Sequence, residues 1–265
     1  MAKEKTAFGT REWASANINI SNGCYNNCKY CYSKSMAIRF KRKTSENWTE
    51  EVLVDTTDRK FFRKYKGKIM FPSSHDITPA TLQTSIEVLK SLLTAGNDLL
   101  IVSKPNLDCI KSLCNELSDY KDKILFRFTI GSANNRTLSF WEPNAPSLKE
   151  RLESLQFAYG EGFKTSISCE PFLDKTVEIL VEKTREYVTD SIWIGKANKL
   201  KAMLTLNGYM DAESLKRANE LEELYKSDYK NILYKLYKKD KMIRWKDSLK
   251  KDFGIELQTE SGLDI

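Results

Sequence analysis

The chain carries three cysteines within eight residues, in the run Cys24-Tyr25-Asn26-Asn27-Cys28-Lys29-Tyr30-Cys31. Cysteine thiolates are the usual protein ligands of iron–sulfur clusters, and four of them commonly hold a complete cubane. Three thiolates on one short loop would bind three irons and leave the fourth iron without a protein ligand. The spacing therefore indicates a 4Fe-4S cluster on Cys24, Cys28 and Cys31 with one open coordination site.

A zinc knuckle is the main alternative for the same cysteines. Zinc sites use C-x2-4-C pairs and take further ligands from elsewhere in the chain. The sequence has no second C-x-x-C or H-x3-H pair, which disfavours zinc. A disulfide framework fits less well, because a chain of 265 residues does not need such staples. The candidate donors for a fourth zinc ligand are His75, Cys109, Cys114 and Cys169.

The composition is that of a globular protein. Hydrophobic residues make up 41% of the chain and charged residues 30%, which is enough apolar material for a sizeable core. No apolar run approaches the ~20 residues that span a bilayer, and no secretory signal is visible at the N-terminus. Free thiols and a reducible cluster favour a reducing compartment. We therefore expect a cytoplasmic protein without a membrane partner.

The net charge of +7 comes from the C-terminal quarter of the chain. Residues 196–251 contain 15 Lys/Arg and 8 Asp/Glu, a difference of +7, so the rest of the chain nets to zero. Lysines can neutralise phosphates while aromatic rings stack on bases, which makes nucleic acid a candidate partner. The alternative is a solvated helix whose tyrosines pack on the rest of the protein. The tyrosines among these lysines are Tyr225, Tyr229, Tyr234 and Tyr237.

Short apolar runs alternate with amphipathic stretches up to about Leu200. This alternation predicts a parallel sheet built from right-handed βαβ units. Beyond residue 205 the pattern becomes helical, with one long helix expected at 211–239 and a shorter one around 242–249. The expected strands are 16–20, 68–71, 99–102, 124–130, 165–169 and 192–194, and the expected helices between them are 81–94, 108–117, 147–159 and 177–188.

Polar residues gather where the predicted strands end, which is where functional residues of parallel α/β folds lie. Ser166, Ser168 and Glu170 recur at period two and should share one face of their strand. A charge is almost never buried without a partner, so Arg127 and Glu170 should face each other or a bound ligand. The other polar residues at strand ends are Ser73, Ser74, His75, Asp76, Ser103, Lys104, Ser132, Asn134 and Asn135.

The cysteine run resembles the signature loop of radical S-adenosylmethionine (SAM) enzymes, C-x3-C-x-aromatic-C, with Tyr30 at the aromatic position. The resemblance implies that the open iron chelates the methionine amino and carboxylate groups of SAM, whose reductive cleavage gives a 5′-deoxyadenosyl radical. It also implies the fold class: α/β, a partial (β/α)6 TIM-like barrel with a C-terminal helical extension. The domains would then be the barrel, 1–205, and the extension packed on it, 206–265.

Residues 18–200 are similar to the spore photoproduct lyase-like (DNA repair photolyase-like) branch of these enzymes. This likeness implies SAM contacts from Ser73 or Ser74, from Lys104 and from Ser132, while the ring of Tyr30 could stack on adenine. Lys104 and Arg127 are cations suited to the carboxylate of SAM. The segments that carry the likeness are Cys31-Tyr32, Ser73-Ser74, Val102-Ser103-Lys104-Pro105, Arg127-Phe128-Thr129-Ile130-Gly131-Ser132 and Ser168-Cys169-Glu170-Pro171.

Two departures from the family pattern matter for the chemistry. Phe71-Pro72-Ser73-Ser74 replaces a Gly-Gly-Glu-type run, so hydroxyls or backbone carbonyls must hold the methionine amine. The lyase has a cysteine beside that serine to return hydrogen to the product radical, and this chain has none, which argues against true photoproduct lyase activity. Cys169 could replace it, although a strand cysteine is more often a small buried hydrophobe. Tyr32 and Glu170 are the other candidate catalytic residues.

The sequence thus predicts a radical SAM enzyme that abstracts hydrogen from a substrate, by lyase-like or other radical chemistry. Nucleic acid is the favoured substrate class, and a peptide or small molecule is the alternative. A second alternative is a non-catalytic nucleic-acid-binding module that holds zinc or a cluster, but such a module needs no cationic pocket inside a barrel. A flavodoxin- or ferredoxin-like protein is the expected one-electron reductant.

Overall fold

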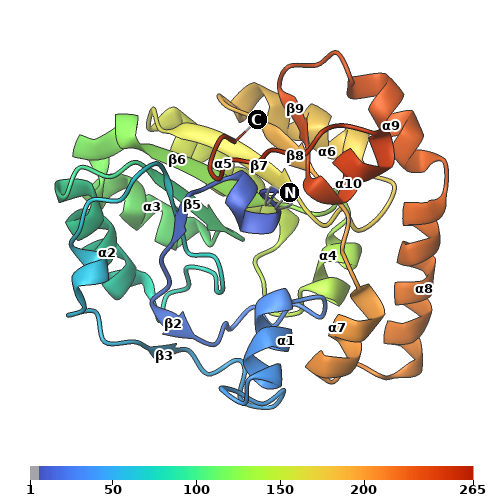
Figure 1. Ribbon diagram of the computed structural model, residues 1–265, viewed down its shortest axis with the longest axis horizontal. Coiled ribbons are helices and arrows are strands. Elements are labelled where there is room, and N and C mark those ends of the chain that lie inside the picture. Colours follow the sequence, from blue (N-terminus) through green and yellow to red (C-terminus); the bar gives the residue numbers. More distant parts are fainter. Residues whose placement is uncertain (1–5, 265) are drawn as a thin grey trace, which may run out of the picture.

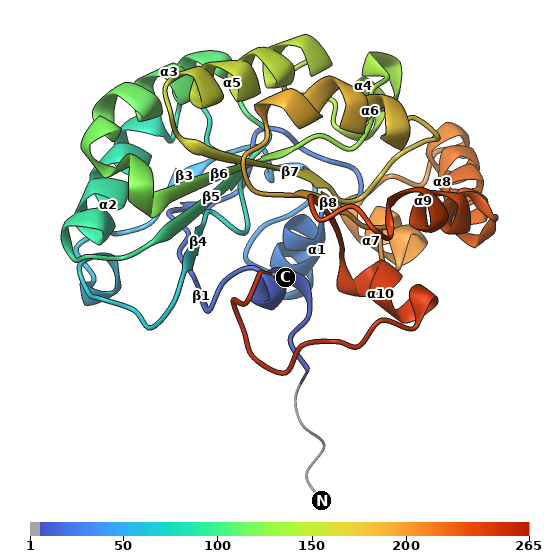
Figure 2. The same cartoon turned by 90° about the horizontal axis from the view of Figure 1, so that it is seen from above.

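A computed structural model describes residues 6–264. Within these residues, seven parallel strands form one sheet that curves into a partial barrel with helices on its outer face (Figures 1 and 2). The predicted α/β class and the partial barrel are confirmed. In spatial order the strands are β1 (Ala16–Asn17), β4 (Ile69–Phe71), β5 (Leu99–Ser103), β6 (Ile124–Thr129), β7 (Lys164–Cys169), β8 (Ile192–Ile194) and β9 (Ile243–Trp245).

Helices follow the strands along the chain, and a short antiparallel ribbon of β2 (Ser21–Asn22) and β3 (Val52–Leu53) stands apart from the main sheet. No helix in the described part of the chain is both long and apolar enough to cross a membrane. The helices are α1 (Tyr32–Arg39), α2 (Leu82–Thr94), α3 (Leu107–Glu116), α4 (Asn135–Trp141), α5 (Leu148–Gly160), α6 (Val177–Thr184), α7 (Leu200–Asn207), α8 (Ala212–Lys226), α9 (Tyr229–Tyr237) and α10 (Asp247–Phe253). Short 3-10 turns are η1 (Gly9–Glu12), η2 (Arg59–Phe61), η3 (Ser118–Lys123) and η4 (Arg185–Tyr187).

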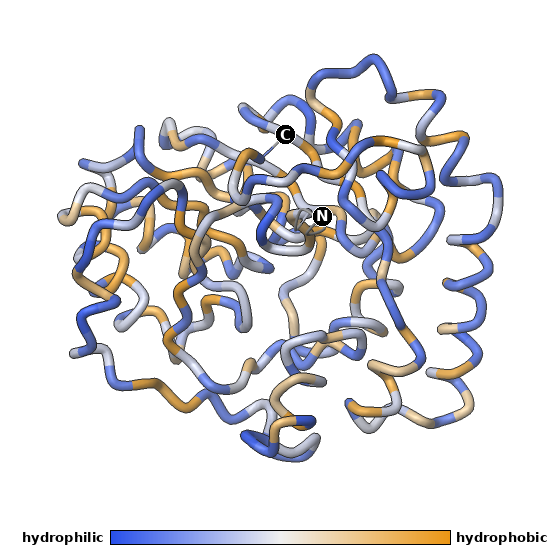
Figure 3. Tube along the Cα trace, in the orientation of Figure 1, coloured by the Kyte–Doolittle hydropathy of each residue, from blue (hydrophilic) through white to orange (hydrophobic). Residues whose placement is uncertain are grey.

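The sheet separates two layers of side chains, because successive strand residues point to opposite faces. On β8, Ile192 and Ile194 join the main core beneath the helices, whereas Trp193 points into the barrel and meets Trp13 edge-on at 5.7 Å. In Figure 3 the hydrophobic colour follows the central strands, while α8 is largely hydrophilic. The inner cluster consists of Trp13, Ala14, Met70, Leu100, Val102, Leu125 and Trp193.

The strands expected from the apolar runs are all present, and the helices between them lie close to their predicted positions. Local signals explain this agreement. Ser147 and Glu150 have capping-box spacing, and the Ser147 hydroxyl accepts the Glu150 N–H at 3.3 Å to begin α5.

Two predictions for the C-terminal region are wrong. The long helix expected at 211–239 is broken into α8 and α9, because Ser227 is extended and its hydroxyl accepts the Tyr229 N–H. Such a local bond competes with a continuous helix. The range 242–249, expected to be a helix, instead holds the strand β9, which pairs in parallel with β8, and only the start of α10. The domain boundary predicted at 205/206 stays a prediction. The region after residue 205 nevertheless contributes the strand β9 to the barrel sheet.

Segments near the two ends of the described chain lie side by side at the open edge of the barrel (Figure 2). The Asp264 N–H donates to the Glu12 carbonyl at 2.9 Å. The Glu12 carboxylate is buried and pairs with Lys246 at 2.7 Å and Lys250 at 3.1 Å. These contacts join η1 to α10 and to the C-terminal tail across the gap between β1 and β9.

Candidate active site

The predicted cluster ligands lie on one loop that follows β1 and β2, at the carboxyl ends of the barrel strands. Within it, the Asn27 N–H donates to the Cys24 carbonyl at 3.4 Å and the Cys31 N–H to the Cys28 carbonyl at 3.1 Å. Asn27 has a φ of 49°, a left-handed conformation that asparagine tolerates. Cys24 and Cys28 are buried and Cys31 is partly buried.

The loop ends by capping α1 with a cysteine sulfur. Cys31 Sγ accepts the Lys34 N–H at 3.3 Å, and a helix N-terminus favours a negative thiolate. Burial nevertheless raises the pKa of all three thiols, and for Cys24 the nearby Asp76, Cys28 and Cys31 raise it further. The metal-free thiols therefore keep their protons, and a metal would have to displace them on binding.

A single metal ion and a cubane require different arrangements of the three cysteine sulfurs. Across residues 6–264, no three His, Cys, Asp or Glu side chains are grouped to hold one ion. A single zinc would draw its sulfurs to within about 4 Å of each other, since each Zn–S bond is about 2.3 Å. In a cubane each thiolate binds a different iron, so the thiols need not converge on one point.

Three of the candidate donors for a fourth zinc ligand make other contacts. Nε2 of the buried His75 accepts the Ile20 N–H at 3.1 Å, and Nδ1 donates to the Asp76 carbonyl at 2.9 Å. Burial lowers the pKa of His75, so the ring is neutral. Its hydrogen bond to Ile20 joins the loop after β4 to the segment between β1 and β2. Cys109 and Cys114 are buried in the main core on α3.

A buried carboxylate, Asp76, organises the ends of β4 and β5 beside the loop. Its Oδ1 accepts the Lys104 N–H at 2.7 Å and its Oδ2 accepts the Asn26 side-chain amide at 2.9 Å. Lys104 Nζ lies 3.6 Å from Asp76 and 6.0 Å from the centre of the Tyr30 ring. Burial alone would lower the pKa of Lys104, but Asp76 raises it well above its ordinary value. A charged ammonium therefore faces the cysteine loop.

Sequence reasoning missed the residues that hold Tyr30. Its hydroxyl donates to Glu142, whose carboxylate pairs with Arg151 at 2.5 Å. Both charged side chains are fully buried, and Arg151 also donates to the Thr129 carbonyl on β6 at 3.2 Å. This series of contacts, from Tyr30 through the two charged side chains to Thr129, connects the cysteine loop to the sheet. No spacing pattern signals it, because the partners are far apart in sequence.

The serines predicted to contact SAM differ in their surroundings. Asn19 Oδ1 accepts the backbone N–H groups of Ser73 at 2.7 Å and Ser74 at 2.9 Å, which fixes this turn while both residues stay partly exposed. Ser132 is buried, and its hydroxyl donates to Asp174 at 2.7 Å. Contacts of these serines with SAM stay predictions.

Arg127 does not face Glu170 or an open pocket, so that expectation is wrong. Its guanidinium is fully buried and pairs with Asp264 at 2.9 Å, while Nε donates to Ser166 at 2.9 Å. The carboxylate comes from the C-terminal tail, which no local pattern could have indicated. This placement gives no support to Arg127 as a SAM ligand.

The three candidate catalytic residues lie in different environments. Cys169 is fully buried in the main core under the helices, on the opposite face of β7 from Ser168, which gives no support to a role as hydrogen donor. Tyr32 is 65% exposed at the start of α1. Glu170 lies 3.7 Å from Lys246, and burial raises its pKa to about 7 although Lys246 opposes the shift. The ammonium of Lys246, the partner of Glu170, lies 4.1 Å from the centre of the Trp13 ring in the inner cluster.

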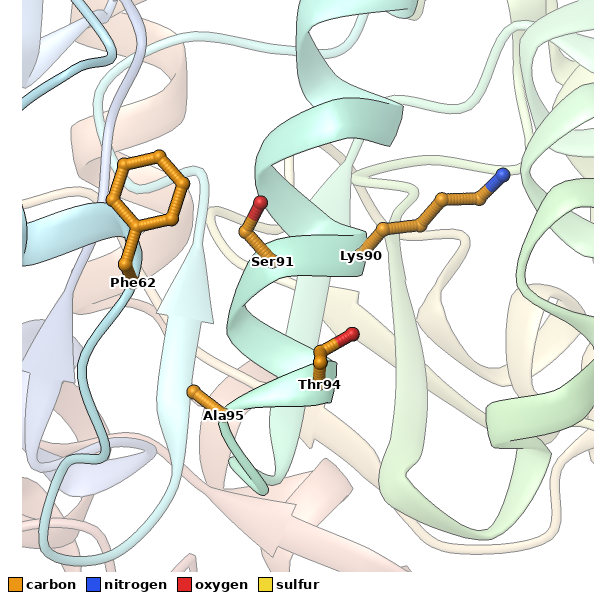
Figure 4. A pocket seen from close by; sticks show the side chains of 5 residues that line it. All are labelled: Phe62, Lys90, Ser91, Thr94 and Ala95. Carbon is orange, nitrogen blue, oxygen red and sulfur yellow. The ribbon is translucent and has the colours of Figure 1, made fainter.

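Two surface hollows lie away from the cysteine loop. One of about 390 Å³ is formed at α2 and is lined by Phe62, Lys90, Ser91, Thr94 and Ala95 (Figure 4). The other, of about 300 Å³, is lined by Lys241, Ile243, Arg244, Trp245, Lys250, Ile255, Glu256 and Gln258. Neither includes a residue of the candidate site.

Comparison with known proteins bears on this geometry. No protein-family model matches the chain. The uncharacterized protein ORF301 of Acidianus two-tailed virus is 27% identical over 250 residues, which cover 86% of this chain and 81% of that protein.

Solved structures share the fold at low sequence identity. A mutant of spore photoproduct lyase with bound AdoMet and dinucleoside spore photoproduct matches with a TM-score of 0.56 and 17% identity, over 80% of this chain and 65% of that one. Streptococcus suis SuiB bound to S-adenosylmethionine matches with a TM-score of 0.53 and 13% identity, over 94% of this chain and 54% of SuiB. The chain thus spans under two thirds of either protein.

These matches show that the chain shares its fold with spore photoproduct lyase and SuiB. The likeness to the fold of spore photoproduct lyase confirms the likeness expected from the sequence.

Proposed function

We propose that the chain is a radical SAM enzyme that holds a 4Fe-4S cluster on Cys24, Cys28 and Cys31 and abstracts hydrogen from a substrate. The observation that carries this proposal is the position of the three-cysteine loop at the strand ends of a radical SAM fold, with the ammonium of Lys104 beside it. When bound, the cluster and SAM would supply a 5′-deoxyadenosyl radical.

The residues around the loop have distinct tasks in this proposal. Lys104 exchanges its contact with Asp76 for one with the SAM carboxylate, which forms a charge-assisted hydrogen bond. Ser73 and Ser74 present hydroxyls and backbone groups to the methionine amine. Tyr30, held by Glu142, keeps its phenol proton because burial and that carboxylate raise its pKa, so it offers a neutral ring to the adenine.

The proposed substrate class is nucleic acid, bound in part through lysines of the C-terminal region. Lys235, Lys238, Lys239 and Lys241 are exposed around the turn from α9 into β9. This turn precedes a barrel strand, so it lies at the opposite end of the sheet from the cysteine loop. It would serve as a remote anchor for phosphates. The alternative, a peptide, is what one SuiB structure contains.

Salt dependence tests the proposed anchor. Reversing the charges of Lys235, Lys238 and Lys239 to Glu should flatten the salt dependence of nucleic-acid binding, whose log–log slope is about −0.7 to −0.9 per neutralised phosphate. Lys149→Glu is a control at an exposed site on α5. Binding that is absent at low salt, or insensitive to salt, favours the peptide alternative.

Metal analysis tests the cluster. Protein purified and reconstituted without oxygen should contain about four irons and four sulfides per chain. Alanine at Cys24, Cys28 or Cys31 should abolish this content, whereas Cys109→Ala and Cys114→Ala, which alter buried core thiols, should retain it. Stoichiometric zinc without visible absorption would contradict the proposal.

A further inference from the structure

The C-terminal part of the chain reaches the cysteine loop through Asn207, the last residue of α7. Asn207 is 1% exposed, and its side-chain amide donates to the Lys29 carbonyl at 2.9 Å and to the Cys31 carbonyl at 3.0 Å. Its Oδ1 accepts the Ser35 hydroxyl at 2.9 Å. Both N–H donors of the Asn207 side chain therefore bind backbone carbonyls of the cysteine loop.

Tyr209 makes a second contact two residues further on. Its hydroxyl donates to the Asn27 carbonyl at 3.3 Å, and its ring lies 4.7 Å from the ammonium of the buried Lys34. Lys34 in turn donates to the Asn27 side chain at 3.0 Å. Gly208, at a φ of 84°, allows the chain to turn from α7 into this contact. The left-handed Asn27 is thus held on both its backbone and its side chain.

These bonds restrict the orientation of the loop peptides. A peptide unit is planar, so holding the carbonyls of Lys29 and Cys31 also fixes the directions of the Tyr30 and Tyr32 N–H groups. Because the potential and stability of an iron–sulfur cluster depend on hydrogen bonds to its sulfurs and on solvent exposure, these orientations matter for a bound cluster.

We propose that Asn207 and Tyr209 are positioning residues for the cluster, which hold the cysteine loop in its ligand-binding shape. This inference rests on the proposed function and extends it, because it gives a role in the cluster site to the region after residue 205. Neither residue belongs to a segment that resembles the radical SAM signature.

The variant Asn207→Asp tests the proposal with almost no change in shape. Asparagine has two N–H donors, whereas an aspartate has one O–H donor when protonated and none when ionised, so at least one bond to the loop carbonyls is lost. We expect iron to pass to a chelator at least tenfold faster than from the wild type under anaerobic conditions. The EPR spectrum and midpoint potential of the reduced cluster should shift as well.

Asn97 offers a matched control. It is fully buried, and its amide donates to the Arg63 carbonyl at 3.0 Å and the Leu92 carbonyl at 2.8 Å, while Oδ1 accepts the Tyr65 N–H at 2.8 Å. Asn97→Asp therefore removes the same kind of bond, at the loop before β5. It should lower the thermal midpoint without changing the iron-release rate or the EPR spectrum.

Tyr209→Phe keeps the ring over Lys34 and removes only the hydroxyl bond to the loop. This variant should fold normally and release iron several-fold faster than the wild type. It therefore tests the proposal even if Asn207→Asp fails to fold. Wild-type iron release and EPR spectra in both loop variants would overturn this inference alone. A wild-type protein that binds no iron would overturn the proposed function as well.

Discussion

Two ion pairs, Glu142–Arg151 and Lys104–Asp76, lie beside the cysteine loop. Glu142 and Arg151 are both fully buried, and such a pair fixes structure because removing one partner leaves the other charge uncompensated. Lys104 and Asp76 differ, since 12% of the Lys104 side chain remains exposed beside the loop. At the residue scale, Lys104 is therefore the cation that can take a new partner without unpacking the core.

Lys104→Met should weaken SAM binding while the iron content stays unchanged. Loss of a hydrogen bond to a charged group costs about 1.5–3 kcal/mol, which corresponds to roughly a 10- to 150-fold higher Kd. Calorimetric titration of SAM into reconstituted protein measures this. Lys230→Met is the control, since Lys230 lies on α9 and its ammonium pairs with the Asp252 carboxylate at 2.6 Å. Equal affinities in both variants would show that the methionyl end of SAM lies elsewhere.

The candidate site residues that could be predicted from the sequence are those marked by a pattern in the neighbouring residues. The cysteines share one loop, and Lys104 directly follows an apolar strand. Glu142 and Asn207 carry no such signal, because each acts through a partner brought close only by the fold. Arg127 shows the same limit: its buried charge predicted a partner, but that partner lies 137 residues away in the tail.

At the scale of elements, β9 shows why short strands escape sequence analysis. It is three residues long, and Ile243 and Trp245 become a strand only because their backbone pairs with β8, with Ile192 opposite Ile243. The longer apolar runs at β5 and β6 were predictable, because both of their faces are buried. The break between α8 and α9 depends on the single Ser227.

The tyrosines on the C-terminal helices pack on the barrel. Tyr225 is buried, and its hydroxyl donates to the Phe172 carbonyl at 2.8 Å. Tyr234 stacks on Phe253 at 4.4 Å and lies 5.7 Å from Trp245. These contacts favour the packing alternative over stacking on bases.

Tyr234→Ala should therefore destabilise the fold without weakening any binding of nucleic acid measured well below the melting temperature. A fully buried aromatic costs about 3–5 kcal/mol on truncation, and the half-buried Tyr234 should cost less, about 1–3 kcal/mol. Denaturant unfolding measures the change. Leu236→Ala, at a site 58% exposed on the same helix, should have little effect. Lost affinity at unchanged stability would instead support stacking.

At the scale of the whole molecule, the segment around Asp264 lies across the open edge of the barrel and is held there by ion pairs. Arg127 binds Asp264 inside the barrel, and Lys68, the residue before β4, pairs with the same carboxylate at 2.9 Å. Burial alone would raise the pKa of Asp264, but Arg127 and Lys68 together lower it below its ordinary value. The tail is thus held in place by an ionised carboxylate.

Asp264→Asn should destabilise the protein in a pH-dependent way. A carboxyl group whose pKa is lowered in the folded state stabilises that state above its unfolded pKa of about 3.9, and loses this effect as the pH falls through the lower folded value. The variant should be less stable at pH 7 by up to about 3–5 kcal/mol, with a difference that shrinks below about pH 4. Thermal melts from pH 2.5 to 7 measure this, with Asp119→Asn at an exposed site as control. A difference independent of pH would argue against the ion pair.

Formation of 5′-deoxyadenosine from SAM tests the central claim most directly. Protein reconstituted without oxygen and reduced with dithionite should cleave SAM slowly to 5′-deoxyadenosine and methionine even without substrate, as chromatography would show. Cys28→Ala, checked for its fold by circular dichroism, should form none. If the wild type carries a full complement of iron and sulfide and still forms no 5′-deoxyadenosine at saturating SAM, the chain is not a radical SAM enzyme.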